Sequence, residues 1–116
     1  MSNPNVKLDE SLERLLEERA ALLEEMSGLS QLVHGSWVER YMVCSRPACK
    51  CHQGERHGPR HFLVVNEQGR QRQKYVASRH ERAVRRGLAQ YRRLAEIVNR
   101  ITELNLALMK VDAYER

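Results

Sequence analysis

The sequence predicts an α+β protein in which two long helices flank a small three-stranded antiparallel β segment that carries a Cys/His zinc site. Apolar residues recur at three- and four-residue steps towards both ends of the chain, which is typical of amphipathic helices. Short runs of β-branched and aromatic residues lie between them, as in strands. A chain of 116 residues suits one core, so we expect a single domain over residues 1–116.

The first helix is expected over residues 8–34. Glutamate and arginine occupy one side, and the other side carries an apolar stripe of Leu12, Leu15, Leu16, Leu22, Leu23, Met26, Leu29 and Val33. Gly28 costs about 1 kcal/mol relative to alanine inside a helix, and we expect the helix to continue through it. The pair His34-Gly35 is the expected stop, because glycine readily takes the left-handed cap conformation.

The middle segment, residues 36–77, is expected to hold the three strands. The first covers residues 37–43, and the next two, residues 61–66 and 70–76, form a hairpin around a turn at 67–69. Four turn-forming residues exclude regular structure from the intervening stretch, namely Pro47, Gly54, Gly58 and Pro59.

The second helix is expected over residues 78–113, and it should begin with a capping box made by Ser78 and Glu81. Its apolar stripe contains Val84, Leu88, Tyr91, Leu94, Ala95, Val98, Ile101, Leu104, Leu108 and Met109. We expect the two helices to pack along each other as a helical hairpin. The distal turns, residues 101–111, could also mediate self-association, in which Asn105 would fix the register.

Four candidate metal ligands have the spacing C-x4-C-x-C-x5-H, namely Cys44, Cys49, Cys51 and His57. An odd number of closely spaced cysteines favours metal ligation over disulfides, and three thiolates with one imidazole complete a tetrahedral shell. The sequence therefore predicts one structural Zn²⁺ ion. His52 and His61 remain alternative imidazole ligands.

Other interpretations of the cluster are three reduced cysteines in a loop, or a redox switch in which Cys49 or Cys51 closes on Cys44. A zinc hydrolase would need an open coordination position and a general base, for which Glu55 is the candidate. Four protein ligands oppose such a site, so we expect no enzymatic activity.

The net charge of +5 is unevenly distributed, because residues 1–43 sum to −4, residues 44–93 to +10 and residues 94–116 to −1. A central basic block of this kind predicts a nucleic acid partner, either DNA or RNA. Its candidate phosphate-binding residues are Arg70, Arg72, Lys74, Arg79, Arg82, Arg85, Arg86 and Arg93. The alternative is that these arginines pair with the acidic first helix through Glu17, Glu18, Glu24 and Glu25.

No apolar run is long enough to span a bilayer, and residues 1–7 lack the apolar stretch of a secretory signal. We therefore expect a cytoplasmic protein with no membrane partner. The predicted function is that of a nucleic-acid-binding accessory protein with a structural zinc. The alternative is an interaction adaptor whose leucine-rich helices bind a partner protein or a second copy of the chain.

Several motifs resemble those of a family of short, uncharacterised prokaryotic proteins that are frequently encoded near transposases. They are GSWVERY at residues 35–41, the three cysteines with Pro47, GERHGP at residues 54–59 and YRRL at residues 91–94. The resemblance covers roughly residues 30–110 and departs from the family pattern at Ala48 and at His61-Phe62. It implies a helix, a Cys-rich β segment and a long C-terminal helix, together with a link to mobile DNA.

Overall fold

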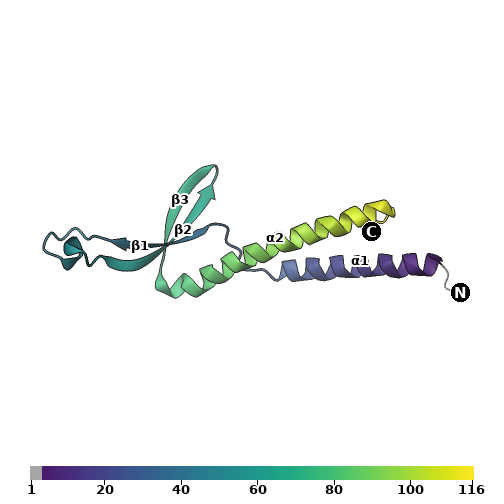
Figure 1. Ribbon diagram of the computed structural model, residues 1–116, viewed down its shortest axis with the longest axis horizontal. Helices are drawn as coiled ribbons and strands as arrows, with labels where there is room; N and C mark the ends of the chain where they lie inside the picture. The colour runs from purple at the N-terminus through teal and green to yellow at the C-terminus, as the bar shows by residue number, and fades with distance from the viewer. Residues whose placement is uncertain (1–3) are drawn as a thin grey trace. The chain divides into compact units, whose positions relative to one another are not determined.

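The computed structural model describes residues 4–116, with side chains from Glu10 onward, so the first three residues of the polar N-terminal segment lie outside it. The elements follow the order α1 (Pro4–Ser27), β1 (Ser36–Met42), β2 (His57–Glu67), β3 (Arg70–Val76) and α2 (Glu81–Lys110) (Figure 1). Short 3₁₀ turns, η1 (Lys50–Gln53) and η2 (Ser78–His80), precede β2 and α2. The predicted α+β class and element order are confirmed. No helix among the described residues is long and apolar enough to cross a membrane.

The chain divides into two compact units. The helical unit contains residues up to Ser30 together with residues 90–116, and the β unit contains residues 31–89. Helix α2 contributes to both, since its first turns belong to the β unit and its remaining turns to the helical unit. The single domain over residues 1–116 stays a prediction, and the two units are described separately below.

In the helical unit, α1 and the distal part of α2 run side by side in opposite directions (Figure 1), which confirms the predicted helical hairpin. Ile97, Leu104 and Leu108 are fully buried. The expected stripe was wrong in part, because it included Val98, which is 49% exposed, and omitted Ile97. One neighbouring helix covers only a narrow line of α2, and the apolar part of α2 is wider than that line.

Ion pairs connect α1 to α2 along one edge of this hairpin. Arg93 Nη2 donates to Glu25 Oε1 at 2.8 Å, and Arg100 Nη2 donates to Glu18 Oε1 at 2.9 Å. Both pairs are exposed, so solvent and salt weaken them, and their main effect is on the register of the two helices. The Arg93–Glu25 pair is the pairing with the acidic helix that the sequence left open as an alternative, whereas the partner of Glu18, Arg100, was not in the predicted set.

Asn105 also acts within the chain, since its Oδ1 accepts a hydrogen bond of 2.9 Å from Arg19 Nη1. It fixes the pairing of α1 with α2, and the expected role in self-association is not needed to explain it. Helix α2 ends at Lys110, three residues before the expected end. Asp112 takes a left-handed conformation (φ 55°) and Ala113 N–H donates to the Leu108 carbonyl at 2.9 Å, which is the pattern of a Schellman motif.

Helix α1 ends at Ser27, so the expectation that it continues through Gly28 to residue 34 was wrong. The Ser27 hydroxyl donates to the Glu24 carbonyl at 2.7 Å, and such side-chain bonds compete with the helical ladder. The segment that follows the helix from residue 31 belongs to the β unit and is held by a hydrogen bond to α2. There Val33 N–H donates to the carbonyl of Gly87 at 3.3 Å, which requires a non-helical segment at residues 31–33.

The sheet has the order β1-β2-β3, with all neighbours antiparallel. Strand β2 pairs with β1 from His57 to Val64 and with β3 from His61 to Glu67, so only residues 61–64 have a neighbour on both sides. The predicted hairpin is confirmed, with Gln68 (φ 50°) and Gly69 (φ 79°) in the positive-φ conformation that two-residue hairpin loops require. β2 begins four residues earlier than expected, because β1 pairs with it as far as His57.

The predicted capping box at the start of α2 was wrong. Glu81 N–H donates to the main-chain carbonyl of Ser78, not to its hydroxyl, because residues 78–80 form a 3₁₀ turn. The Glu81 carboxylate instead lies 3.3 Å from Arg85 Nε and 3.7 Å from His61 Nδ1. Glu81 therefore joins the first turn of α2 to the sheet.

Candidate metal centre

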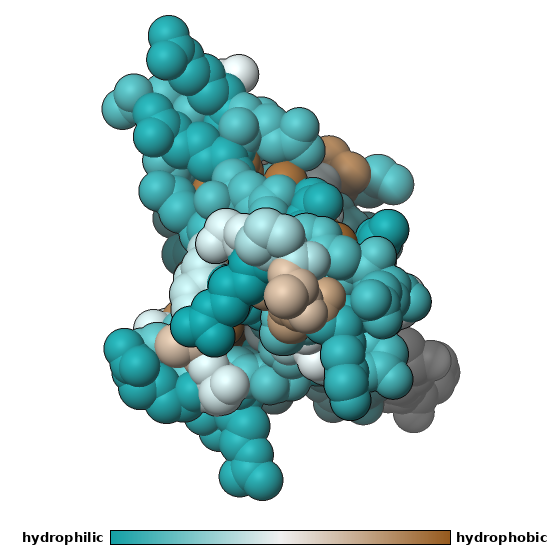
Figure 2. Space-filling model, turned by 90° about the vertical axis from the view of Figure 1, so that its left-hand side faces the viewer, coloured by the Kyte–Doolittle hydropathy of each residue, from teal (hydrophilic) through white to brown (hydrophobic). Residues whose placement is uncertain are grey.

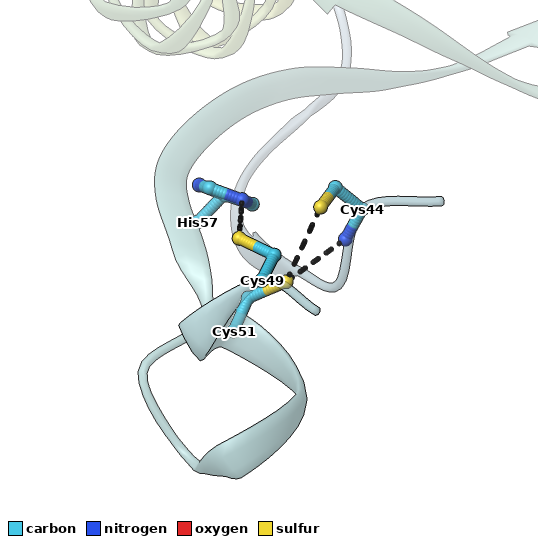
Figure 3. A group of neighbouring side chains, drawn as sticks. All are labelled: Cys44, Cys49, Cys51 and His57. Atoms are coloured by element: carbon cyan, nitrogen blue, oxygen red, sulfur yellow. Dashed lines mark hydrogen bonds between the residues drawn. The ribbon is translucent and has the colours of Figure 1, made fainter. Parts of the chain in front are cut away.

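The four predicted ligands all lie in or next to the connection between β1 and β2, here called the metal loop (residues 44–57). Cys44 follows the end of β1 and His57 begins β2, and the two strands are paired up to Met42 and His57. Strand pairing therefore brings the first and last ligands to the same end of the sheet. The turn η1 carries Cys51, with Cys49 as its N-cap residue, and Gly54 (φ 113°) ends the turn. Figure 3 shows the four side chains converging from these three segments.

The ligand atoms of Cys44, Cys49, Cys51 and His57 all lie within 4.8 Å of one another, close enough to hold a metal ion. Cys44 Sγ and Cys51 Sγ are 3.5 Å apart, and Cys49 Sγ is 3.2 Å from His57 Nε2 (Figure 3). A tetrahedral zinc site with Zn–S bonds of about 2.3 Å has edges of about 3.6–3.8 Å. The spacings of 3.5 and 3.2 Å differ from these edges by only a few tenths of an ångström, and the other ligand atoms lie within 4.8 Å of one another.

Main-chain groups orient the sulfur atoms. Cys44 N–H donates to Cys51 Sγ at 3.2 Å, and Cys51 is almost completely buried, with 2% of its surface exposed. Cys44 and Cys49 are half-buried, and His57 is exposed. Seen from the end where the metal loop lies, the surface is largely hydrophilic (Figure 2), so the buried Cys51 lies under a polar exterior.

The thiols differ in acidity. A hydrogen bond from the Cys51 backbone, with further bonds from Cys44 and Cys51 side chains, lowers the pKa of Cys49 to about 6. Burial raises the pKa of Cys51 above its ordinary value. A thiolate is the metal-binding form of cysteine, so Cys49 presents the form that ligation requires near neutral pH.

The structure also distinguishes the three histidines that the sequence offered. His52 Nε2 donates to the Cys44 carbonyl at 2.8 Å, so this ring supports the loop from outside the ligand set. His61 stacks on Trp37 with ring centroids 5.0 Å apart, and its Nε2 lies 3.2 Å from Glu39 Oε1. His57 is the histidine that lies among the cysteines. The supporting bond of His52 was missed by the sequence analysis, although its position beside Cys51 was a signal for it.

Residues 7–86 match a family described as a domain of unknown function (DUF6788). The chain belongs to this family. The matched range contains α1 from residue 7 onward, the whole sheet, the metal loop and the first turn of α2. Comparisons with curated proteins and with solved structures find no match.

The predicted basic residues of the DUF6788 chain fall into three groups. Arg70, Arg72 and Lys74 share one side of β3, as expected, and two of them approach one carboxylate. Arg72 Nε lies 3.4 Å from Glu67 Oε2, and Lys74 Nζ lies 3.8 Å from Glu67 Oε1. The expected basic ridge on this strand is therefore partly neutralised.

On α2, three of the predicted residues have partners. Arg85 lies 4.9 Å above the Trp37 ring and forms ion pairs with Glu39 and Glu81. Arg86 Nε donates to Gln31 Oε1 at 2.9 Å. Arg93 belongs to the helical unit, where Glu25 and Glu96 bind it. These contacts hold the fold together and reduce the positive charge available to a partner.

The remaining candidates are Arg70, Arg79 and Arg82. All three are exposed, and none of them has an ion pair or a side-chain hydrogen bond with the side chains of residues 10–116. They are the members of the predicted set with the most accessible positive charge in the DUF6788 chain.

Proposed function

We propose that Cys44, Cys49, Cys51 and His57 hold one structural zinc ion, and that the β unit containing them binds nucleic acid without catalysing a reaction. The convergence of four ligand atoms within 4.8 Å carries the proposal. Three sulfur donors and one imidazole suit zinc better than magnesium, calcium or manganese, because those ions favour oxygen ligands.

A structural role is favoured because the four side chains complete a tetrahedral shell. Catalytic zinc sites retain an open position for water or substrate, usually with three protein ligands. Glu55, the acidic residue of the metal loop, is exposed at its surface. In this arrangement the zinc joins the end of β1 to the start of β2 and fixes the irregular chain between them.

Metal analysis of protein purified without chelators tests the zinc proposal. We expect one zinc ion per chain, which is lost in Cys51→Ser and retained in Ser45→Ala, a variant with an exposed non-ligand of the same loop. Removing the metal should lower thermal stability, because the energy of binding contributes to folding. Metal-free protein with unchanged stability would overturn the proposal.

The nucleic acid proposal is supported by the net charge of +10 on residues 44–93 and by the accessible arginines of the β unit. Arginine suits phosphate groups because its planar fork donates two parallel hydrogen bonds. The resemblance to proteins encoded near transposases makes mobile DNA the first polymer to test, beside RNA.

Binding to labelled oligonucleotides over a range of salt concentrations tests this proposal. Affinity should fall steeply with salt, since phosphate contacts release counterions. Replacing Arg79 and Arg82 by glutamate should weaken binding. Replacing Arg14 and Lys110, exposed residues of the helical unit, by glutamate is the charge-matched control and should weaken it much less. Salt-independent binding, or none, would contradict the proposal.

A second candidate function is self-association through the helical unit. Beside the buried line of α2, Arg93 and Arg100 lie on one flank, and Leu94 and Val98 lie on the other. A hollow of about 270 Å³ lies on this second flank, lined by Tyr91, Leu94, Ala95, Val98 and Asn99. On α1, Leu23 is 45% exposed and lies on the flank opposite Glu18 and Glu25. The edge of the hairpin away from the ion pairs thus carries exposed apolar side chains from both helices, beside the hydrogen bond of Arg19 to Asn105.

We propose a second copy of the chain as the occupant of this edge, giving a four-helix arrangement. Val98→Asp should then convert a dimer to a monomer in analytical ultracentrifugation. Leu106→Asp is the matched control, because Leu106 is 54% exposed and lies on a different side of α2. A wild-type protein that is monomeric at all concentrations would rule out this function.

A further inference from the structure

The two faces of the sheet differ in charge balance. The register places Trp37, Glu39, His61, Leu63, Lys74 and Val76 on one face, towards Glu81 and Arg85 of α2. The other, here called the open face, carries Val38, Arg40, Arg60, Phe62, Val64, Gln71, Gln73 and Tyr75. The carboxylates of Glu39, Glu67 and Glu81 make their ion pairs with residues of the first face or of α2. The open face contains two arginines and no acidic residue.

Arg40 and Arg60 are directly opposite each other across β1 and β2. Like charges in this position repel and destabilise a sheet unless an anion lies between or beside them. Arg40 Nη2 donates to Gln73 Oε1 at 2.8 Å, but the amide is neutral and leaves the charge unbalanced. Among the side chains described, those of residues 10–116, neither arginine has a carboxylate at ion-pair distance.

Aromatic surface lies next to this pair of arginines. Phe62 is two residues from Arg60 on the same face, a separation of about 7 Å along a strand. Phe62 and Tyr75 are direct neighbours across β2 and β3, with ring centroids 5.8 Å apart at an interplanar angle of 66°. Tyr75 is 61% exposed, more than any other large hydrophobic side chain of the described residues. A large exposed aromatic ring on a sheet is costly in water, and a planar ligand could cover it.

Polar groups suited to base edges complete the face. Val64 forms part of a hollow of about 210 Å³ that Arg40, Gln71, Arg72 and Gln73 also line. Glutamine amides both donate and accept, which allows them to pair with the edge of a base. Cationic, aromatic and amide groups together are the three kinds of contact that single-stranded nucleic acids use.

We propose that the open face binds a single-stranded nucleic acid, with bases stacked on Tyr75 and Phe62 and phosphates at Arg40 and Arg60. The inference rests on the proposed nucleic acid function and specifies its polymer and its surface. Duplex nucleic acid would bind this face poorly, because its bases are stacked inside the helix and offer no ring to Tyr75.

Fluorescence anisotropy of the zinc-bound full chain tests the inference, with a labelled single strand and the duplex of the same sequence as probes, each as DNA and as RNA. The single strand should bind more tightly. Tyr75→Ala should weaken this binding by about tenfold or more, the typical loss for one stacked base. Tyr75→Phe should retain affinity. Tyr75→Leu keeps an apolar contact with Phe62, and it should bind as weakly as Tyr75→Ala while remaining folded.

The arginines should contribute by neutralising phosphates. Replacing Arg40 and Arg60 by glutamine should weaken single-strand binding and reduce the slope of log affinity against log salt by about 0.7 for each phosphate that is no longer neutralised. Replacing Arg14 and Lys110, exposed residues of the helical unit, by glutamine removes the same charge away from the sheet, and it should have little effect.

Two contrary results are distinguishable. Binding that persists both in Tyr75→Leu and when Arg40 and Arg60 are replaced, or that favours the duplex, would overturn the open face while leaving the nucleic acid function intact. Absence of binding to every probe at low salt would overturn the nucleic acid function itself.

Discussion

Gly87 provides the sharpest test of how the β unit is packed. It lies inside α2, where alanine is normally better than glycine by about 1 kcal/mol. Here a Cβ atom would lie 2.1 Å from the Gln31 carbonyl oxygen and 3.0 Å from Val33 Cγ2. Ordinary contact begins near 3.4 Å, so residues 31–33 would have to retreat by about 1.3 Å. We therefore expect Gly87→Ala to destabilise the protein, although alanine has a higher helix propensity than glycine.

The expected magnitude combines three effects. Overpacking of a tight contact costs about 1–3 kcal/mol, and loss of the hydrogen bond from Val33 N–H to the Gly87 carbonyl costs about 1 kcal/mol. The gain in helix propensity offsets about 1 kcal/mol. The net loss is about 2 kcal/mol, or a fall in melting temperature of roughly 5–10 °C for a domain of this size.

Urea unfolding of the zinc-bound protein measures this loss. The single tryptophan, Trp37, lies on β1, so its fluorescence reports on the β unit while circular dichroism reports on the helices. Gly28→Ala is the matched control, since the only nearby atom to a Cβ there is the Glu25 carbonyl oxygen at an ordinary 3.5 Å. It should be neutral or slightly stabilising. A Gly87→Ala protein as stable as the wild type would refute the close approach of residues 31–33 to α2.

Three further predictions concern charge, the metal loop and backbone conformation. Hydrogen bonds from Arg93 lower the pKa of Glu25 below 4.5, so the stability that this carboxylate adds is complete above pH 4.5 and is lost as the pH falls through the lowered value. In thermal melts, Glu25→Gln should therefore be less stable than wild type at neutral pH and equally stable in acid. Glu24→Gln is the control, because Glu24 has no ion pair among the described side chains, and it should show no such trend. His52→Ala removes the bond to the Cys44 carbonyl and should weaken zinc affinity by about 10–100-fold in competition with a chelator, whereas a wild-type affinity would exclude a supporting role. Gly58→Ala places a side chain at φ 140° and 2.8 Å from the Arg40 carbonyl oxygen, so it should lower the melting temperature, and an unchanged melting curve would count against this conformation.

Local patterns determined how much of the fold could be predicted. The hairpin around Gln68-Gly69 was correct because its turn and its alternating strands are encoded within a few residues. The end of α1 was not predicted correctly, because it depends on the contact of residues 31–33 with Gly87, which lies more than fifty positions away. Gly87 itself carried no local signal beyond being a glycine in a helical pattern.

In the candidate site, too, the features encoded locally were predicted, and those that depend on tertiary contacts were not. Its four ligands were predicted from donor chemistry and spacing, and they do lie close enough to hold a metal. The charge of the basic block was visible in the sequence, but its distribution was not. Which arginines are neutralised depends on tertiary partners, such as Glu25 for Arg93 and Glu39 for Arg85. The opposition of Arg40 and Arg60 likewise appears only once the register of β1 and β2 is known.

Residues 61–64 of β2 pair with both β1 and β3, and this double pairing has a consequence for hydrogen exchange. Amides there belong to the part of the strand that has a partner on each side, so their exchange requires the loss of more than one neighbour. The two ends of β2 each have a single partner, β1 towards the metal loop and β3 towards the turn. Either end can therefore open locally while the central segment stays protected. Chelation of the metal should accelerate exchange at the end near His57, which includes Arg60 of the open face, and leave the hairpin near Glu67 unchanged.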